Sequence, residues 1–581
     1  IAPKNNESKH ISLFCSACKQ TIYPYHLLHH KKTHKALNLL GFDSPQTKTD
    51  SKILLAQRQK LISKLTKTPK YSEAHRQKID YSLEFLLDNH TPISYCDPAN
   101  INNPSTLKKV NNALIKALSV CQDKNSTWQK DMEDIFIVLD NYGNRSDTCF
   151  LGLVDGFHGA TAAETVAAEL PLLFLDQLAQ TDSSYKTSKD EQLILDSFAT
   201  VFKADYKEKE SIFSDKPGSD ETSKTNTYEW IHKAYAKSFW RMDRLLQLGR
   251  NEVSKVRWSG CSVVTCLVER IPSEETHGTE EEEKKHCENN RHSPSARTAK
   301  GVAGLLHIAN IGNTHAVLCK NGKNYCLSKE HSTSNVSERK RILQNGGNIS
   351  TNEPDGLVEG YLRTTRGLGH HGDPVVKRSV IPVPHTISVP IDDTCQFLIL
   401  ASNGLWEVLD YNQVLALTLT TFTDYLRTYE CVQQNETSSY KCQHVMPLTE
   451  ENSNDLKALN DLQDGILYSN EDIFFTDLKG NLKPNKAKRS GENYAGQELL
   501  KTVSPAGSKS PPLFEEDTEM YSSNCKPKTA GRSRVTSETL YNNAASYVSE
   551  QLVKTALAAG SRDNITVLIV LLNGCDKIPK Y

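Results

Sequence analysis

The stretch FLILASNGLWEVLD, residues 397–410, contains the pattern on which the interpretation of the whole chain depends. It begins with an apolar run of strand length, continues with Asn403-Gly404, and ends in the helix-like LWEVL. The pattern predicts a buried strand, a tight turn and a short helix. A short polar side chain at such a turn is a common metal ligand, yet Asn403 offers an amide and not a carboxylate. The stretch therefore marks either a metal centre or a former one.

The composition indicates a large globular protein without a general affinity for polyanions or lipid. The chain has 581 residues, enough for several domains or for one large domain with insertions. Its formal net charge is -1, so no global field favours nucleic acid or a membrane surface. The longest apolar runs, such as 565–572, have the length of strands and are too short to cross a membrane. We expect no membrane association.

The cysteines and the first residues bear on the compartment. The 15 cysteines are scattered over the chain, and most of them lie in apolar, strand-like contexts. Such cysteines are typical of reduced core residues in a cytosolic or nuclear protein. The first ten residues are polar and contain no signal-peptide core. We therefore expect a cytoplasmic or nuclear protein that is not secreted.

A motif of the zinc-finger type lies near the beginning of the chain. Cys15, Cys18, His30 and His34 have the spacing C-x2-C-x11-H-x3-H, one residue shorter than usual. Two thiolates from a hairpin and two imidazoles one helical turn apart can close a tetrahedron around Zn²⁺. His29 is a competing ligand, and an unmetallated basic helix is the alternative. A single finger reads only about three base pairs, so protein contact or structural tethering is at least as well supported as DNA recognition.

The pattern of apolar and polar residues along the chain predicts three regions. Residues 1–36 form the C2H2-like finger segment, and residues 37–110 form a partly helical leader. From 111 to 581, short β-branched runs alternate with amphipathic helical stretches, which indicates an α+β layered domain. Two charged or polar segments without periodicity, 273–300 and about 428–537, interrupt this domain and are predicted to be mobile insertions.

Acidic or amide side chains recur where the predicted strands end or begin. Convergence of such carboxylates at one edge of a sheet is how proteins hold hard divalent cations. The residues at these positions are Glu133 and Asp134 in DMEDIF, Asp155 and Gly156 in FLGLVDGFHGA, Asn313 in ANIGNTHAVL, Asn403 in ILASNGLW, and Asp563 and Asn564 in GSRDNITVLIV.

With these motifs the chain resembles the metal-dependent Ser/Thr protein phosphatases of type 2C. The resemblance covers about 111–581 apart from the insertions, and it also includes SGCSVVTCLVE and LRTTRGLG in the family's order. It implies a four-layer α-β-β-α sandwich with two stacked antiparallel sheets, preceded here by the small zinc-finger-like segment. It further implies a site for two Mg²⁺ or Mn²⁺ ions, which orient a bridging water for attack on a phosphoester.

Part of the family's metal site is retained. The resemblance implies that Asp155 is the bridging aspartate and that Gly156 offers a backbone carbonyl to one metal. Glu133 matches the acidic residue that contacts a metal through water, and Asp563 matches a direct ligand. Two neighbours of these ligands are also retained, Asp134 and Asn564. An alternative is that these acids only accept hydrogen bonds from the amides of their own turns.

Two departures concern substrate and proton transfer. The arginine that grips the substrate phosphate in the family falls at Gln129, which cannot form a charged bidentate fork. The histidine proposed as general acid falls at Phe157. His158 is the next residue, but adjacent side chains at a turn need not point the same way.

Further departures concern the metals. The hairpin aspartate that serves an additional metal falls at Asn313, and the ligand shared by metals falls at Asn403. The acidic residue after LRTTRGLG falls at His370, with Asp373 three residues later as a partial substitute. An amide oxygen binds a hard cation more weakly than a carboxylate does. Binding of Mg²⁺ or Mn²⁺ at Asp155, Gly156, Asp563 and Glu133 is therefore expected to be weakened.

Together the departures predict a catalytically impaired protein. Loss of a general acid typically costs about 10²–10⁴-fold in rate, and here the phosphate clamp and two metal ligands are lost as well. We expect a pseudophosphatase, a monomer that acts as a regulator by binding a protein or phosphoprotein, and we do not expect nucleic acid to be its partner. One alternative is a weak Mg/Mn-dependent Ser/Thr protein phosphatase in which His158 is a displaced acid. Another is a nucleic-acid-associated factor led by the finger.

Overall fold

The computed structural model describes residues 12–15, 17–42, 50–66, 73–88, 103–198, 228–247, 255–271, 303–350, 356–434, 445–448, 468–469 and 537–578. The chain divides into one unit made of Ile1–Glu471 with Ser537–Tyr581 and a second unit, Asp472–Thr536, which lies outside the described residues. The predicted insertion at 273–300 also lies outside them. Of the insertion predicted at about 428–537, only the edges and two short strands are described.

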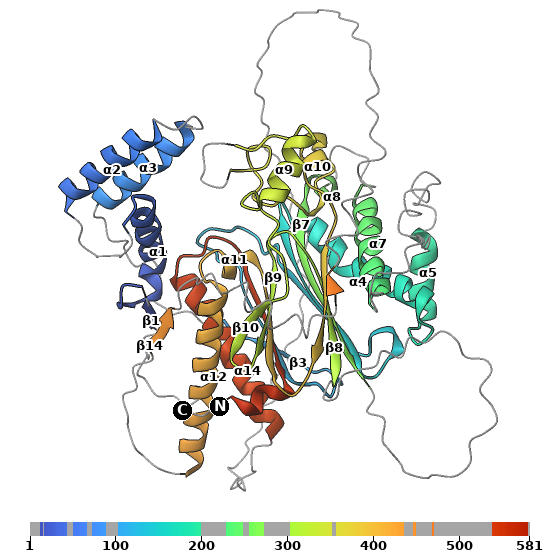
Figure 1. The fold of residues 1–581 in the computed structure, drawn as a ribbon. Coiled ribbons are helices and arrows are strands. Elements are labelled where there is room, and N and C mark those ends of the chain that lie inside the picture. Colours follow the sequence, from blue (N-terminus) through green and yellow to red (C-terminus); the bar gives the residue numbers. More distant parts are fainter. Residues whose placement is uncertain are drawn as a thin grey trace, which may run out of the picture. The chain divides into compact units, whose positions relative to one another are not determined.

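Two large sheets form the body of the first unit, and all of their ladders are antiparallel. The strand order is β10-β9-β13-β16-β4-β3 in one sheet and β15-β12-β8-β7-β6-β5 in the other, with β11 paired to β7 (Figure 1). The strands of the first sheet are β3 Thr106–Lys108, β4 Ile115–Asp123, β9 His315–Lys320, β10 Lys323–Cys326, β13 Cys395–Ala401 and β16 Ile565–Leu572. Those of the second are β5 Ile135–Leu139, β6 Thr148–Phe157, β7 Gly260–Arg270, β8 Gly304–Ile311, β11 Leu368–Gly369, β12 His385–Ile391 and β15 Tyr468–Ser469.

Strand β13 contains the apolar run of the opening stretch and is buried on both faces. Phe397 and Ile399 belong to a hydrophobic cluster shared with helices α12 and α14. Leu398 and Leu400, which point the other way, belong to a cluster formed between the two sheets. Because successive side chains of a strand alternate between faces, a strand packed on both sides needs an uninterrupted apolar run, and that is what residues 397–401 supply.

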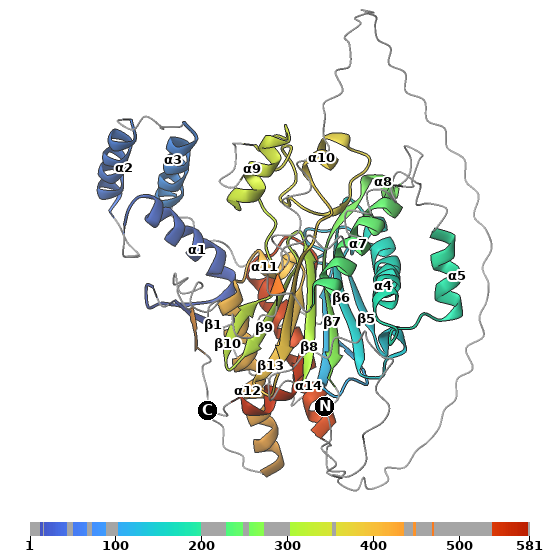
Figure 2. The same cartoon turned by 45° about the vertical axis from the view of Figure 1, so that its right-hand side comes forward.

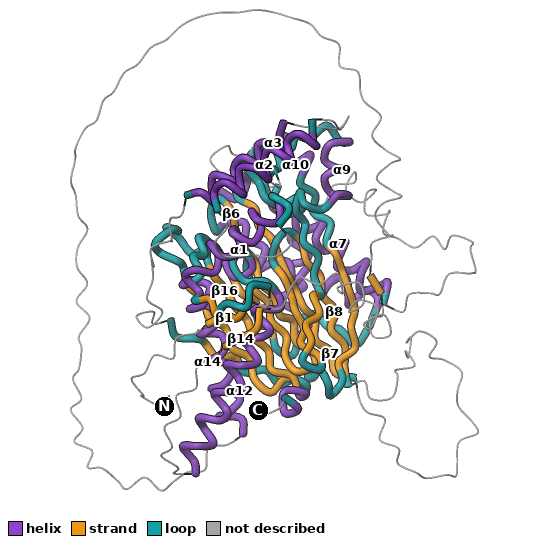
Figure 3. Tube along the Cα trace, turned by 60° about the vertical axis from the view of Figure 1, so that its left-hand side comes forward, coloured by secondary structure: helices purple, strands orange, loops and turns teal. Residues whose placement is uncertain are grey.

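Helices cover the outer faces of both sheets. α4 Thr161–Thr181 and α7 Glu229–Leu246 pack on β6, β7 and β8 (Figure 2). α12 Tyr411–Gln434 and α14 Ser537–Ala558 pack on β4, β13 and β16. Figure 3 shows the strands in orange, with β7 and β8 running side by side. The predicted α+β class with antiparallel sheets is confirmed, and its hydrophobic clusters lie between helices and sheet, between the two sheets, and again between sheet and helices.

Shorter elements complete the part of the chain that follows the leader. Helices α9 and α10 belong to a segment with its own small hydrophobic cluster, which lies between β10 and β12 in the chain. The remaining elements are η2 Tyr142–Asn144, α5 Lys189–Phe198, α8 Lys255–Trp258, α9 Val336–Gln344, α10 Pro374–Ser379, α11 Asn403–Trp406 and η4 Asn573–Lys577.

The N-terminal region contains a hairpin and three helices. The hairpin pairs β1 Ser12–Cys15 with β2 Thr21–Ile22, and β14 Val445–Leu448 pairs with β1 in parallel. α1 Pro24–Leu39 runs across the boundary predicted at residue 36. The helices α1, α2 Ser51–Leu65 and α3 Glu73–Leu87 share a hydrophobic cluster. Within the predicted leader, β3 is an edge strand of the first sheet.

No helix in the described part of the chain is both long enough and apolar enough to cross a bilayer.

A buried ion-pair network fixes helix α9. Glu338 is 1% exposed, and its carboxylate accepts hydrogen bonds from Arg341 Nη2 and Arg366 Nε, each at 3.0 Å. Burial by itself raises the pKa of Glu338, but Arg366 and Arg341 outweigh burial and hold the pKa at about 2. Because Arg366 lies in the motif LRTTRGLG, this network links α9 to that motif.

Glu338→Gln is expected to lower the free energy of unfolding by about 3 kcal/mol at neutral pH, because it leaves two buried guanidinium groups without their counter-charge. Since the folded-state pKa is about 2 and the ordinary value is 4.5, the stabilisation is complete above pH 4.5. It is lost as the pH falls toward 2. Urea unfolding of both proteins from pH 2 to 7 measures the difference. The exposed neighbour variant Arg339→Gln is the control, and a difference independent of pH would contradict the prediction.

Candidate functional site

Two turns lie pressed together at one edge of the sandwich. The turn after β13 begins helix α11 with Asn403 and Gly404, and the turn before β16 contains Asp563 and Asn564. β13 and β16 are antiparallel neighbours, so the end of one meets the beginning of the other. A Cβ atom at Gly404 would lie 2.1 Å from the carbonyl oxygen of Asn564. The close packing of the two turns therefore requires glycine at this position.

Asp155 reaches the same place from the second sheet. It lies near the end of β6 and is 2% exposed. Its Oδ2 accepts a hydrogen bond of 3.0 Å from the backbone N–H of Asn403. The structure thus brings Asp155, Asn403 and Asp563 together, although the first and the last lie 408 positions apart in the sequence.

Asn403 and Gln129, the two amides at positions where the resemblance implies charged residues, both point their nitrogen atoms at Asp563. Asn403 Nδ2 lies 3.4 Å from Asp563 Oδ2, and Gln129 Nε2 lies 3.4 Å from Asp563 Oδ1. Gln129 Nε2 also donates to the carbonyl oxygen of Arg562 at 2.9 Å. In this arrangement amide N–H groups face both oxygens of the retained carboxylate.

Glu133 is held by backbone groups of the neighbouring turns. Its Oε1 accepts a hydrogen bond of 3.1 Å from the N–H of Gly159, and its own N–H donates to Asn564 Oδ1 at 2.7 Å. A Cβ atom at Gly156 would lie 2.7 Å from the carbonyl oxygen of Glu133. Glu133, Gly156 and Asn564 are therefore positioned by mutual packing next to Asp155.

Burial and mutual repulsion raise the pKa values of the acidic residues at this site. Burial, together with the charges of Asp134 and Asp563, raises the pKa of Asp155 well above its usual range. Burial also raises the pKa of Asp134 to about 7, although Thr566 Oγ1 donates a hydrogen bond to it at 2.8 Å. Buried carboxylates that raise one another's pKa in this way are stabilised by a cation or by protons.

Phe157, which the resemblance matches to the family's general acid, has a ring that packs on a histidine. Phe157 stacks on His370 with a centroid distance of 6.4 Å. His158 is exposed, has a backbone φ of 60°, and meets His370 edge to face at 5.9 Å. Burial, and then His158, lowers the pKa of His370 to about 4. The structure places His158 at the surface beside these rings.

Asp373 is engaged elsewhere. Its carboxylate caps helix α10 by accepting hydrogen bonds from the N–H groups of Val375 and Val376, and it also accepts the hydroxyl of Tyr361 at 2.6 Å. The sequence-based suggestion that Asp373 partly substitutes for the acidic residue at position 370 thus finds no supporting contact.

Asn313 has a partner that the sequence did not single out. It lies in the turn between β8 and β9, and its Oδ1 accepts the hydroxyl of Ser262 at 2.8 Å. Ser262 is the cross-strand neighbour of Asp155 on β7. The available signal was a serine within the apolar strand SGCSVV, since a polar residue in a buried strand needs a hydrogen-bond partner.

The residues present fit a two-cation centre poorly. Asp155 and Asp563 are retained, but the amide nitrogens of Gln129 and Asn403 face Asp563. Within the described ranges, ligand atoms of three or more Cys, His, Asp or Glu residues converge only in the finger segment. We therefore derive no catalytic step through Mg²⁺ or Mn²⁺ for this chain.

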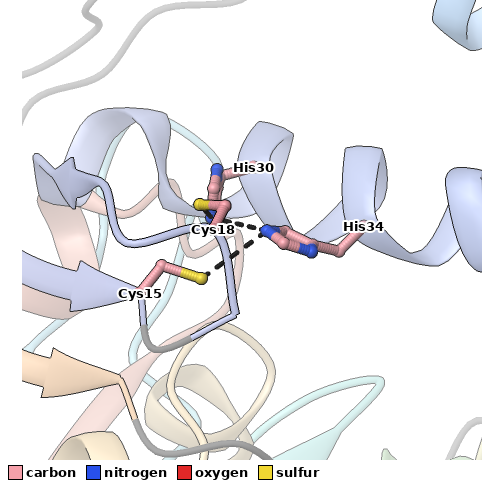
Figure 4. A group of neighbouring side chains, drawn as sticks. All are labelled: Cys15, Cys18, His30 and His34. Atoms are coloured by element: carbon pink, nitrogen blue, oxygen red, sulfur yellow. Dashed lines mark hydrogen bonds between the residues drawn. The ribbon is translucent and has the colours of Figure 1, made fainter. Parts of the chain in front are cut away.

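The finger residues form a compact cluster (Figure 4). The ligand atoms of Cys15, Cys18, His30 and His34 all lie within 4.8 Å of one another. Cys15 Sγ is 3.5 Å from His34 Nε2, and Cys18 Sγ is 3.6 Å from His30 Nε2. Zn–S and Zn–N bonds of about 2.3 and 2.0 Å in a tetrahedron place sulfur and nitrogen about 3.6 Å apart. The cluster therefore has dimensions suited to a metal ion such as Zn²⁺.

The state of the histidines also suits a metal. Burial, and then His34, lowers the pKa of His30 to about 4, so its ring is neutral at physiological pH. A neutral imidazole is the form that binds metal. His29, the competing ligand considered from the sequence, contacts the ring of Phe85 on α3 at a centroid distance of 5.1 Å and is not part of the cluster.

Comparisons with known proteins agree on one family. A family model described as protein phosphatase 2C matches residues 274–466. The human protein named "Protein phosphatase 2C-like domain-containing protein 1" (Homo sapiens) is 43% identical over 574 residues, which cover 97% of this chain and 89% of the human protein. The protein of the same name from Mus musculus is 38% identical over 566 residues, which cover 97% of this chain and 88% of the mouse protein.

Proposed function

Because this chain belongs to the protein phosphatase 2C family, in the group of the phosphatase 2C-like domain-containing protein 1 relatives, we propose that it is a pseudophosphatase that regulates by binding a protein or phosphoprotein. The family as a whole depends on Mg²⁺ or Mn²⁺. The observation that carries the proposal is the contact of Gln129 and Asn403 with Asp563, in which amide donors face the carboxylate that would bind a cation.

Charge supports the loss of catalysis. A dication at Asp563 would have to displace both amide donors, and it would gain from Asn403 only an amide oxygen, a weaker ligand for a hard cation. Phosphate binding loses the guanidinium that Gln129 replaces. Proton transfer to the leaving group loses the histidine that Phe157 replaces, and removal of such an acid lowers rates by about 10²–10⁴-fold. These three losses all affect hydrolysis of the phosphoester, so their effects on the activation free energy need not add.

Exposed aromatic residues near the turns support a binding role. Trp128 is 51% exposed, and the Arg562 guanidinium lies over its ring at 4.7 Å. Tyr361 is also exposed, and its ring lies 6.4 Å from that of His158. Aromatic and arginine side chains are enriched where proteins bind proteins. We propose that the protein is a monomer and that its partner binds the surface formed by Trp128, Arg562, Tyr361 and His158.

A turnover assay tests the pseudophosphatase proposal. Hydrolysis of a phosphoserine peptide by the full chain in millimolar Mn²⁺ is expected to equal that of the Asp155→Ala variant, because no metal-dependent site is assembled. The weak-phosphatase alternative predicts Mn²⁺-dependent hydrolysis that is lost in Asp155→Ala and reduced in His158→Ala. Robust activity of that kind would overturn the proposal.

We further propose that Cys15, Cys18, His30 and His34 bind one Zn²⁺. Substitution by Co²⁺ is expected to give the visible absorption of a tetrahedral thiolate–imidazole site, and Cys15→Ser is expected to abolish it. The control is Cys326→Ser, which removes an exposed free cysteine outside the cluster. Absorption unaffected by Cys15→Ser would contradict the assignment. The alternative of a finger-led nucleic-acid factor predicts a salt-dependent gel shift that is lost with the zinc.

We also propose an intracellular location, cytoplasmic or nuclear. It is supported by the cysteines, which are free wherever the structure describes them and are mostly buried. Buried free thiols behave as small apolar core residues in a reducing compartment.

A further inference from the structure

The finger helix α1 contacts the segment that follows Asn403. Lys31 is the residue after His30, and its Nζ donates to the carbonyl oxygen of Val408 at 3.1 Å and to Gln413 Oε1 at 2.6 Å. The same Nζ lies 3.5 Å from Asp410 Oδ2. These partners join the end of α11 to the beginning of α12. Lys31, the neighbour of the predicted metal ligand His30, thus holds the segment that follows the turn at Asn403.

The same helix reaches the second turn. Leu28 lies beside the end of α14, since a Cβ atom built on Gly560 would be 3.5 Å from Leu28 Cδ1. Gly560 precedes Asp563 by three residues. Leu27 is fully buried and shares one hydrophobic cluster with Val408, which follows α11, and with residues of α14. The small core of the finger is therefore continuous with the core of the phosphatase-like domain.

Glu407 joins the two turns to each other. Its Oε1 accepts the hydroxyl of Ser561 at 2.9 Å and the backbone N–H of Arg562 at 2.7 Å. Glu407 immediately precedes Val408, the acceptor for Lys31. A continuous set of contacts therefore runs from the Cys/His cluster through α1 to both turns of the candidate site.

We propose that the finger is an intramolecular brace, in which Zn²⁺ fixes α1. Lys31 and Leu28 of α1 then hold the segment 403–413, which follows β13, and the segment 556–564, which precedes β16. The partner of this finger is the phosphatase-like domain of its own chain. Zinc fingers depend on their metal to fold, and we expect the hairpin and the first turns of α1 to depend on it here as well. Loss of zinc would therefore release Lys31 and Leu28 together. The inference rests on the proposed zinc site and is independent of the turnover assay.

Hydrogen exchange of the full chain tests the brace, with zinc content measured in parallel. Lys31→Ala is expected to retain one zinc per chain but to speed amide exchange in 404–413 about tenfold, the effect of losing one charge-assisted hydrogen bond. Lys32→Ala, which changes the exposed neighbouring lysine, is the matched control and should leave exchange unchanged. Cys15→Ser is expected to lose zinc and to speed exchange in both 404–413 and 556–564.

Two outcomes would overturn the brace and are distinguishable from each other. A parental chain that binds no zinc would remove the metal on which the brace depends. A Cys15→Ser chain that loses zinc while exchange at both turns stays as in the parent would leave the zinc site standing and refute the coupling. Because Lys31→Ala keeps all four ligands, its result does not depend on whether a ligand variant folds.

Discussion

Replacing Gly404 by alanine is expected to lower the free energy of unfolding by about 4 kcal/mol, well beyond the usual effect of a surface Gly→Ala change. The added Cβ would lie 2.1 Å from the carbonyl oxygen of Asn564. That oxygen is a backbone atom and cannot rotate away as a side chain would. The turn before β16 would have to move, and it holds Asp563 and the first residues of a buried strand.

Urea unfolding of the full chain measures this effect. The control is Gly322→Ala in the turn between β9 and β10, where nothing lies within 4 Å of the added atom but where, unlike at Gly404, the backbone φ is positive. The control isolates the strain of a left-handed alanine, about 1 kcal/mol. If Gly404→Ala were no more destabilising than Gly322→Ala, the two turns would not be pressed together as described.

Restoring the family residues is expected to restore metal binding first. Asn403→Asp places a second carboxylate at the position where an amide nitrogen now lies 3.4 Å from Asp563. Without a cation the two charges repel each other, so the variant should be less stable than the parent in a chelating buffer. Saturating Mn²⁺ should reverse this, since a ligand at a hundred times its Kd stabilises by about 2.7 kcal/mol. Thermal unfolding with and without Mn²⁺ measures both effects, and the parent should show neither.

The complete restoration should bring back activity. Gln129→Arg, Phe157→His, Asn313→Asp and Asn403→Asp together are expected to raise Mn²⁺-dependent hydrolysis of a phosphoserine peptide at least about 100-fold over the parent, the lower range for recovering a general acid. The same set with Asp155→Ala is the control and should stay at the parental rate. A restored chain that binds Mn²⁺ without turnover would mean that the geometry around the site has drifted.

Much of the fold follows from local patterns. The strand β13 and the turn at Asn403 were expected from residues 397–410 because an apolar run and a glycine turn are read within a few neighbouring residues. The family order of the motifs placed Asp155 and Asp563 at one site, and the structure brings them together. The Cys/His spacing likewise predicted a cluster, because four residues within 20 positions have few ways to be arranged.

The partners of the polar groups could not be predicted in this way. Asp373 caps a helix instead of entering the site, and His29 contacts Phe85 instead of the cluster. Ser262 bonds to Asn313 from another strand. In each case the side-chain type was visible in the sequence, but its direction depends on a backbone position set by packing elsewhere in the chain.

The sequence by itself showed that residue 403 is an amide at a position where the resemblance implies a carboxylate, and it predicted the surrounding strand, turn and helix. Only the tertiary structure decided what that amide faces. Asn403 Nδ2 meets Asp563 from 160 positions away, and Lys31 reaches Val408 across 377. Such contacts arise because antiparallel pairing of β13 with β16, and a hydrophobic cluster shared by finger and domain, bring distant segments together. Which polar atoms meet therefore depends on how these distant segments pack.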